Sequence, residues 1–255
     1  MAKLTQRFKV ACGVLVIAVV YGLLLVANTR SSAPSEWTFD SPGTGRPLNV
    51  LAELVSVNAT RGTAQLQFSS DADRDVVIDV GDAHSERDVR QNSDFTADLD
   101  GSIAFYPADQ YATEFHVRAH DAGRVLPLHL TLREELDDWN AFAADAGNRS
   151  GVGIALKIRR PVPAVFFGVV IYLVMALVAA SALAIGALVY LRKRKIEATL
   201  IGALAGMLFA LPAMRGALPG SPPLGVTADV LIFLWAEVAV AVALSLFVWS
   251  WATTK

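Results

Sequence analysis

The sequence predicts a membrane protein of mixed α and β structure, with four transmembrane helices and an extracytoplasmic antiparallel β-sandwich inserted between helices 1 and 2. Three observations predict this class. Hydrophobic residues make up 54% of the 255 residues and gather in four blocks, each long enough to cross a hydrocarbon core of ~30 Å. Between the first two blocks, apolar residues recur with period two, which is typical of half-buried strands. Basic residues gather on one side of the predicted helices, and this excess predicts which side faces the cytoplasm.

Changes in composition set the boundaries of the predicted segments. In order, these are a cytoplasmic N-terminus (1–9), transmembrane helix 1 (10–27), a linker (28–46), the extracytoplasmic β-sandwich (47–162), transmembrane helix 2 (164–191), a basic cytoplasmic loop (192–197), transmembrane helix 3 (198–214), an extracytoplasmic Pro/Gly loop (215–225), transmembrane helix 4 (226–251) and a cytoplasmic C-terminus (252–255). The first block exceeds the ~7–15 apolar residues of a signal peptide, so it is interpreted as an uncleaved anchor.

Lysine and arginine placement predicts the topology. The basic residues that fall on one side of four helices are Lys3, Arg7, Lys9, Arg192, Lys193, Arg194, Lys195 and Lys255. Because cytoplasmic loops carry the excess of basic residues, both termini are expected inside a bacterial inner (plasma) membrane. Lys157, Arg159 and Arg160 end the long outer domain, where charge counts carry little weight, and are expected to contact the outer lipid headgroups.

The outer domain reads as a series of short strands. Leu126, Leu128, Leu130 and Leu132 give the clearest alternation, and Ile103 and Phe105 are expected to form another strand before a corner at Tyr106–Tyr111. Many short strands separated by turns favour an antiparallel sandwich.

One stretch of the outer domain breaks this pattern. In Glu134–Ala146, the residues Leu136, Trp139 and Ala143 have helical spacing. The stretch is therefore expected to form a short amphipathic helix that caps the sandwich, with a partner-binding or interfacial helix as the alternative.

The sequence predicts no catalytic site, cofactor or metal. It lacks a G-x-S-x-G elbow, a phosphate-binding glycine loop and an H-E-x-x-H pair. His116 and His120 lie on one face of a predicted strand but about 13 Å apart, too far for both to ligate one zinc ion. The outer domain shows no basic surface pattern that would predict nucleic-acid binding.

Ionisable residues in or beside the last two apolar blocks are the main chemical signal. Arg215 ends the third block and is expected to meet Asp229 rather than Glu237, which lies deep in the fourth block. A charge in hydrocarbon costs ~2.5–3.5 kcal/mol on insertion scales, so Glu237 needs a proton or a partner. Two roles for Glu237 stay open. It forms a structural lock within the bundle or with a partner helix, or it has a proton- or substrate-linked role. Gly202 and Gly206 form a G-x-x-x-G pair suited to close helix packing.

Two motifs carry a resemblance to a known family. They are the corner Tyr106-Pro107-x-Asp109-x-Tyr111 and the hairpin signature Pro219-Gly220-Ser221-Pro222-Pro223-Leu224-Gly225 with Trp235-Ala236-Glu237. Together with the order of helices and strands, they resemble an actinobacterial family of four-helix membrane proteins of unknown function. That family is similar to lipid-uptake coordinator proteins, which accompany multi-subunit Mce (mammalian cell entry) lipid importers.

The resemblance implies a non-enzymatic accessory or assembly subunit of an envelope transporter, whose partners are membrane lipids and another membrane protein, with no nucleic acid. Candidate partner-binding or structural residues are Tyr106, Pro107, Asp109, Tyr111, Arg215, Pro219, Pro222, Pro223, Asp229, Trp235 and Glu237. Two alternatives from other classes stay open: an extracytoplasmic ligand receptor or sensor, and a small proton-coupled transporter that uses Glu237.

Overall fold

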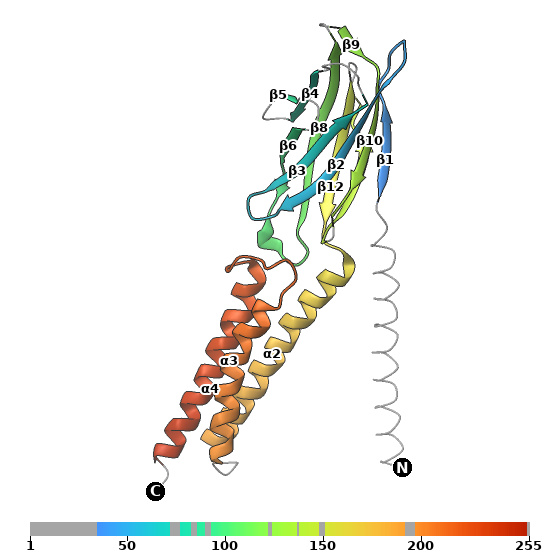
Figure 1. The fold of residues 1–255 in the computed structure, drawn as a ribbon. Coiled ribbons are helices and arrows are strands. Elements are labelled where there is room, and N and C mark those ends of the chain that lie inside the picture. The colour runs from blue at the N-terminus through green and yellow to red at the C-terminus, as the bar shows by residue number, and fades with distance from the viewer. Residues whose placement is uncertain are drawn as a thin grey trace, which may run out of the picture. The chain divides into compact units, whose positions relative to one another are not determined.

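The computed structural model describes residues 35–71, 77–82, 86–89, 93–121, 124–136, 138–147, 151–191 and 197–253. The helix expected at 10–27 and the basic residues at 192–195 lie outside these ranges. The described chain divides into two compact units, called here the β unit (residues up to 102 together with 110–163) and the helical unit (103–109 together with residues from 164 onward). Figure 1 shows the elements of both.

The β unit contains two sheets that share one core. The first has the order β1 (Glu36–Asp40), β10 (Leu128–Glu134), β2 (Leu48–Asn58), β3 (Thr63–Ser70) and β6 (Ser93–Asp98). The second has the order β11 (Asn140–Asp145), β12 (Val152–Arg159), β8 (Gln110–Asp121), β4 (Val77–Asp82) and β5 (Glu86–Val89), and β7 (Asp100–Gly101) and β9 (Arg124–Leu126) also pair with β8. The strands pair antiparallel, as expected, with one exception among the described strands: β2 and β10 pair in parallel.

Alternation along the strands builds the core of the β unit. Leu128, Leu130 and Leu132 of β10 are buried, while the residues between them are only partly buried. The Phe95 ring of β6 lies 6.3 Å from the Phe115 ring of β8, which belongs to the other sheet. The buried faces of the two sheets therefore meet in one hydrophobic cluster, as expected for a sandwich.

The predicted linker at 28–46 is wrong for part of its length, because β1 lies within it. Trp37 and Phe39 pack against the core of the β unit and alternate with more exposed residues. Phe39 pairs with Leu130 in an antiparallel ladder. The five-residue alternation is short, and the surrounding Ser, Pro and Gly residues conceal it in the sequence.

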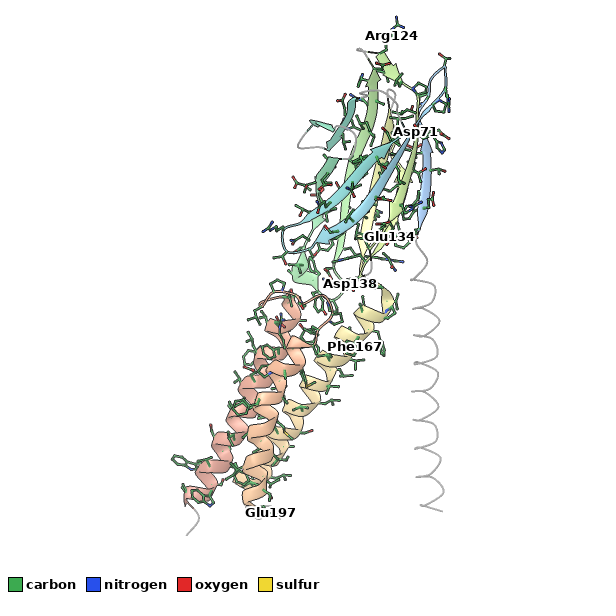
Figure 2. The ribbon with its side chains drawn as sticks, in the orientation of Figure 1. Asp71, Arg124, Glu134, Asp138, Phe167 and Glu197 are labelled. Atoms are coloured by element: carbon green, nitrogen blue, oxygen red, sulfur yellow. The ribbon has the colours of Figure 1, made fainter. Side chains whose placement is uncertain are left out.

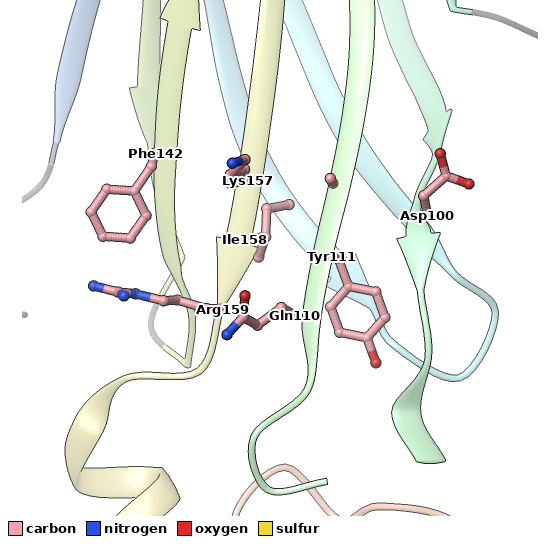
Figure 3. A pocket seen from close by; sticks show the side chains of 8 residues that line it. Asp100, Gln110, Tyr111, Phe142, Lys157, Ile158 and Arg159 are labelled. Atoms are coloured by element: carbon pink, nitrogen blue, oxygen red, sulfur yellow. The ribbon is translucent and has the colours of Figure 1, made fainter. Parts of the chain in front are cut away.

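The helix predicted at Glu134–Ala146 is also wrong. Residues 140–145 form β11, which pairs antiparallel with β12. Glu134, labelled in Figure 2, is the last residue of β10. Its carboxylate accepts a 2.8 Å hydrogen bond from the Ala141 backbone N–H. Phe142 points to the outer face of the sheet, where the Arg159 guanidinium carbon lies 4.5 Å from its ring centroid (Figure 3). Pairing with β12 therefore overrides the local helical spacing.

The strand predicted at Ile103 and Phe105 is a short 3₁₀ turn, η1 (Ile103–Phe105), and it belongs to the helical unit. Phe105 is exposed, whereas Tyr106 directly after it is buried in the cluster formed by the helices. The segment therefore does not continue the strand pattern of the β unit, because Tyr106 packs within the helical unit.

Three helices of the helical unit are long and apolar enough to cross a membrane. They are α2 (Val162–Tyr190), α3 (Ala198–Gly216), and the π-helical turn η2 (Asp229–Phe233) continued by α4 (Leu234–Thr253). Buried residues recur every three or four positions on α4, as at Ala236, Val240 and Ala243. A Cβ built on Gly186 of α2 would lie 2.8 Å from Ala243 Cα, so glycine permits this close contact.

Candidate functional site

Buried polar groups gather where α3 ends and η2 begins. Arg215 lies in the last turn of α3 and Asp229 is the first residue of η2. A cation is favoured near a helix C-terminus and an anion near an N-terminus, because these positions complement the backbone dipoles. The local sequence therefore places two opposite charges on either side of the connecting loop.

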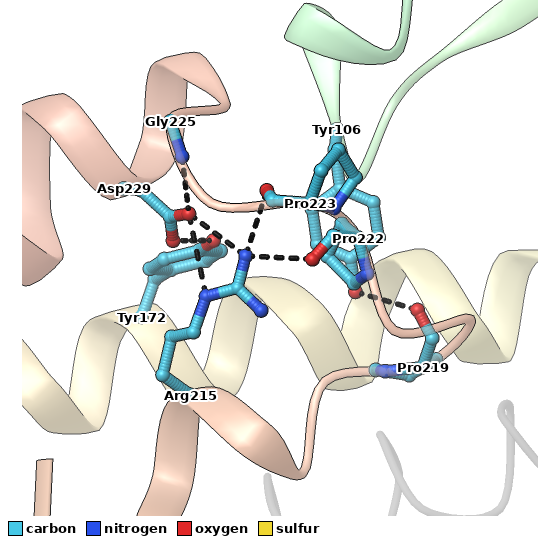
Figure 4. A network of polar contacts seen from close by, with 8 residues as sticks. All are labelled: Tyr106, Tyr172, Arg215, Pro219, Pro222, Pro223, Gly225 and Asp229. Carbon is cyan, nitrogen blue, oxygen red and sulfur yellow. Dashed lines mark hydrogen bonds and ion pairs between the residues drawn. The ribbon is translucent and has the colours of Figure 1, made fainter. Parts of the chain in front are cut away.

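The expected pairing of Arg215 with Asp229 is confirmed (Figure 4). Arg215 Nη2 lies 2.9 Å from Asp229 Oδ2, and Arg215 Nε donates to the same oxygen at 3.3 Å. The side chains of Arg215 and Asp229 are only 11% and 2% exposed. Since burial removes water, the pair has to supply its own hydrogen-bond partners.

Arg215 also holds the proline-rich loop. Its Nη2 donates hydrogen bonds of 2.8 Å to the carbonyl oxygens of Pro222 and Pro223. The Gly225 backbone N–H donates a 3.2 Å hydrogen bond to Asp229 Oδ2. Gly225 has a φ of 98°. A left-handed φ of this kind favours glycine, so Gly225 suits the turn that brings its N–H to the carboxylate.

Two tyrosines extend the network to other segments of the helical unit. The Tyr172 hydroxyl on α2 donates a 2.8 Å hydrogen bond to Asp229 Oδ1. The Tyr106 hydroxyl donates a 3.1 Å hydrogen bond to the Pro219 carbonyl oxygen. Tyr172 was not predicted from the sequence, although a phenol in an apolar helix indicates that its hydroxyl needs a partner. The loop at 103–109, α2 and the α3–η2 connection are thus joined by polar contacts.

A glycine lets the 103–109 loop approach α2. A Cβ built on Gly168 would lie 3.0 Å from Pro107 Cβ and 3.3 Å from the Tyr106 hydroxyl oxygen. The peptide bond between Tyr106 and Pro107 is cis. Asp109 at the end of the same loop is buried. Like Tyr172, Gly168 was not predicted from the sequence to belong to this site.

Chemically, the arrangement serves to hold groups in place. Asp229 accepts hydrogen bonds from Tyr172, from Gly225 and from two nitrogens of Arg215. Both carboxylate oxygens are therefore engaged, and the guanidinium is fixed by one carboxylate and two carbonyls. Such a set of charge-assisted hydrogen bonds fixes the positions of the helix ends that carry it.

Several candidate residues lie away from this network. Tyr111 belongs to the β unit, where its ring lies edge-on to Trp139 at 5.6 Å. Trp235 is 67% exposed on α4. Glu237 is half-buried, and no residue in the described part of the chain forms a hydrogen bond or ion pair with it. A Cβ on Gly202 or Gly206 would meet no atom within 4 Å.

Two histidines of the β unit, His120 and His129, are each paired with a carboxylate. His120 Nε2 lies 2.9 Å from Asp79 Oδ2, and His129 Nδ1 lies 2.6 Å from Asp40 Oδ1. Within the residues that the structure describes, no three His, Cys, Asp or Glu side chains are grouped so as to hold a metal ion.

Two family models match adjacent parts of the chain. Residues 160–254 match a family model described as a domain of unknown function (DUF8686). Residues 74–159 match a second model, described as a domain of unknown function (DUF4436). The border between them falls where β12 ends at Arg159, shortly before α2 begins at Val162. A search of curated proteins gave no match.

Proposed function

We propose that this chain is a non-enzymatic accessory or assembly subunit of a multi-subunit envelope transporter, of the Mce lipid-importer type. It is anchored in a bacterial inner membrane, with both termini in the cytoplasm and the β unit outside. The three apolar helices support a membrane location. The corner and hairpin motifs support the assignment to lipid import, because the membrane-protein family that they resemble is similar to lipid-uptake coordinator proteins.

The main support for this proposal is the position of Glu237 and its lack of a polar partner among the described residues. It lies eight residues after Asp229, about 12 Å along the helix axis, within a run that is long and apolar enough to cross a membrane. Unlike Asp229, it has no hydrogen-bond or ion-pair partner among the described residues. A carboxyl group in hydrocarbon costs ~2.5–3.5 kcal/mol, so a donor on a neighbouring transmembrane helix would stabilise it. A subunit that docks on a larger complex obtains such a donor when it assembles.

The open face of α3 offers a place for another helix. Gly202 and Gly206 are exposed, and Phe209, one turn further on the same side, is 77% exposed. Glycines spaced by four residues let two helices approach closely, and this packing stabilises association in lipid. Two helices of the unit thus carry features suited to a membrane-embedded partner.

The Arg215–Asp229 network has a different role in this proposal. Because its polar groups are satisfied within the chain, it acts as an internal lock. Arg215 and Asp229 therefore fix the positions of α3 and α4, and Glu237 and the glycine face are left for the partner. Of the partner candidates, Trp235 is the exposed neighbour of Glu237 on α4.

Co-purification with cross-linking tests the proposal. The full chain is tagged in its own host, cross-linked in the membrane, extracted in mild detergent and analysed by mass spectrometry. We expect subunits of a lipid importer with the wild type, and at least tenfold lower recovery with Glu237→Leu and with Gly206→Leu. Ser245→Ala is the matched control on α4, because its hydroxyl bonds only to the Ala241 carbonyl of its own helix. Recovery of the wild type alone would contradict the proposal.

The second candidate, a proton-coupled transporter, rests on the same free carboxyl group. Glu237→Gln separates the two functions, because it keeps the size and hydrogen-bonding capacity of the side chain but removes its proton exchange. Under the subunit proposal, this variant retains at least part of the complex that Glu237→Leu loses. Full assembly together with complete loss of transport would favour the proton-coupled role.

A further inference from the structure

The second sheet of the β unit bears a pocket of about 320 Å³ on the face turned away from the core (Figure 3). Strands β7, β8, β12 and β11 line it with exposed polar side chains and the exposed Phe142 ring, and the buried residues Tyr111 and Ile158 also border it. Neither the proposed membrane partner nor the histidine pairs involve this pocket. Its chemistry follows from the strand register.

One row of residues crosses four strands. Phe142 on β11 pairs with Lys157 on β12, Lys157 pairs with Ala112 on β8, and Ala112 pairs with Asp100 on β7. Paired residues point to the same face, and neighbouring strands lie ~4.8 Å apart. The backbone positions of Lys157 and Asp100 are thus about 10 Å apart, and the small Ala112 side chain leaves the floor between them open.

A second row adds further donors beside Lys157. Arg159 pairs with Gln110, and Arg159 is two residues, or about 7 Å, along β12 from Lys157 on the same face. The guanidinium carbon of Arg159 lies 4.5 Å from the Phe142 ring centroid, which restricts its position. Within the described residues, Lys157, Gln110 and Asp100 have no side-chain hydrogen bond or ion pair. Their polar groups are therefore open to a ligand.

The pocket thus has opposite charges at its two sides. Lys157, Arg159 and the Gln110 amide suit a phosphate group, because ammonium, guanidinium and amide groups all donate hydrogen bonds to its oxygens. Asp100 suits an ammonium group across the Ala112 floor. We propose that this pocket binds a phosphoester that carries a neighbouring amine, as in the headgroup of phosphatidylethanolamine.

The position of the pocket along the chain favours a lipid as the source of this group. Arg159 stands three residues before Val162, the first residue of α2. Three residues span at most about 11 Å, so Arg159 lies at the level of the headgroups when α2 crosses a bilayer. This inference depends on α2 being a transmembrane helix, but it does not depend on the transporter partner.

Binding by the purified full chain tests the proposal. The chain is held in an uncharged detergent and titrated by calorimetry with dihexanoyl-phosphatidylethanolamine, dihexanoyl-phosphatidylglycerol and glycerophosphoethanolamine. The variants are Lys157→Gln, Asp100→Asn and Ala112→Leu, all at positions that are exposed or only partly buried. Arg124→Gln on β9 is the control, because it removes an exposed cation outside the pocket.

We expect phosphatidylethanolamine to bind at least tenfold more tightly than phosphatidylglycerol. Lys157→Gln should weaken both lipids about tenfold, and Asp100→Asn should weaken only phosphatidylethanolamine. Ala112→Leu should abolish binding by filling the floor, and Arg124→Gln should leave it unchanged. Equal affinity for both lipids, or wild-type affinity in Lys157→Gln and Asp100→Asn, would overturn the proposal.

Glycerophosphoethanolamine identifies the source of the bound group. A loss of tenfold or more relative to the lipid supports a membrane lipid as the ligand, because the acyl chains then contribute to binding. Equal affinity supports the same phosphate-and-amine site but assigns it to a water-soluble phosphoester.

Discussion

The Tyr172 hydroxyl donates a 2.8 Å hydrogen bond to Oδ1 of Asp229, which lies 57 residues later in the chain. The other carboxylate oxygen of Asp229 accepts from Arg215 and from the Gly225 backbone. One buried carboxylate therefore joins α2 to the hairpin between α3 and α4. The stability of the helical unit should depend on each of these contacts to a different extent.

Removal of the Tyr172 hydroxyl should destabilise the chain. Tyr172→Phe leaves Asp229 Oδ1 without a donor, and a hydrogen bond to a charged group contributes about 1.5–3 kcal/mol. We expect a lower melting temperature of the purified full chain in detergent. Tyr190→Phe on the same helix is the control, because Tyr190 is 49% exposed. Equal melting temperatures of the two variants would show that the Tyr172 bond contributes nothing.

Arg215 and Asp229 should behave as one unit in a double-mutant cycle. Arg215→Gln or Asp229→Asn alone leaves a buried charge without its counter-ion, which costs about 3–5 kcal/mol. The double variant should lose less than the sum of the single losses, because neither charge then remains. Thermal unfolding of the four proteins in detergent gives the coupling.

Arg215→Lys provides a further test of the network. A lysine keeps the charge but cannot reproduce the planar fork that contacts Asp229, Pro222 and Pro223 together. The lysine variant should therefore fall between the wild type and Arg215→Gln in melting temperature. Additive losses in the cycle, together with a lysine variant as stable as the wild type, would contradict the lock.

Two glycine-to-alanine changes should have opposite signs. Helix propensity alone favours alanine by ~1 kcal/mol at either site. At Gly186, however, the new Cβ would lie 2.8 Å from Ala243 Cα and 2.9 Å from its carbonyl oxygen, so α2 and α4 must move apart. At Gly202 it would meet nothing within 4 Å. Gly186→Ala should lower the melting temperature, whereas Gly202→Ala should keep or raise it; a rise in both would refute the close α2–α4 contact.

The hairpin pair could be predicted because it depends on neighbouring parts of the sequence. A basic residue in the last turn of one helix and an acidic residue in the first turn of the next are brought together by the short loop between them. Tyr172 could not be assigned in this way. Its phenol indicates a need for a partner, but the partner is fixed by how α2 packs against the hairpin.

The features of the β unit that were predicted wrongly from the sequence also depend on distant strand partners. Three of the six residues of β11 are alanine and its phenylalanine is exposed, so hydrophobic periodicity does not separate a strand from a helix there. Its ladder with β12 decides the conformation. The parallel pairing of β2 with β10 joins segments about 80 residues apart. No local pattern shows which strand a given strand will pair with.

Glu134 should make the stability of the chain depend on pH. Burial raises the pKa of this carboxyl group, although hydrogen bonds from the Ala141 N–H and the Ser35 side chain oppose the shift. The folded chain thus holds the proton more tightly than the unfolded chain, where an ordinary glutamate titrates near pH ~4.3. The stabilisation from the protonated form is complete below that pH and is lost as pH rises through the raised pKa.

Glu134→Gln isolates this effect, because the amide oxygen can still accept from the Ala141 N–H but does not titrate. The melting temperature of the variant relative to the wild type should increase between pH ~4 and pH ~7. Glu135→Gln, at the exposed neighbouring position, is the control and should show no such trend. A difference between Glu134→Gln and the wild type that stays constant over this range would mean that Glu134 titrates alike in the folded and unfolded chains.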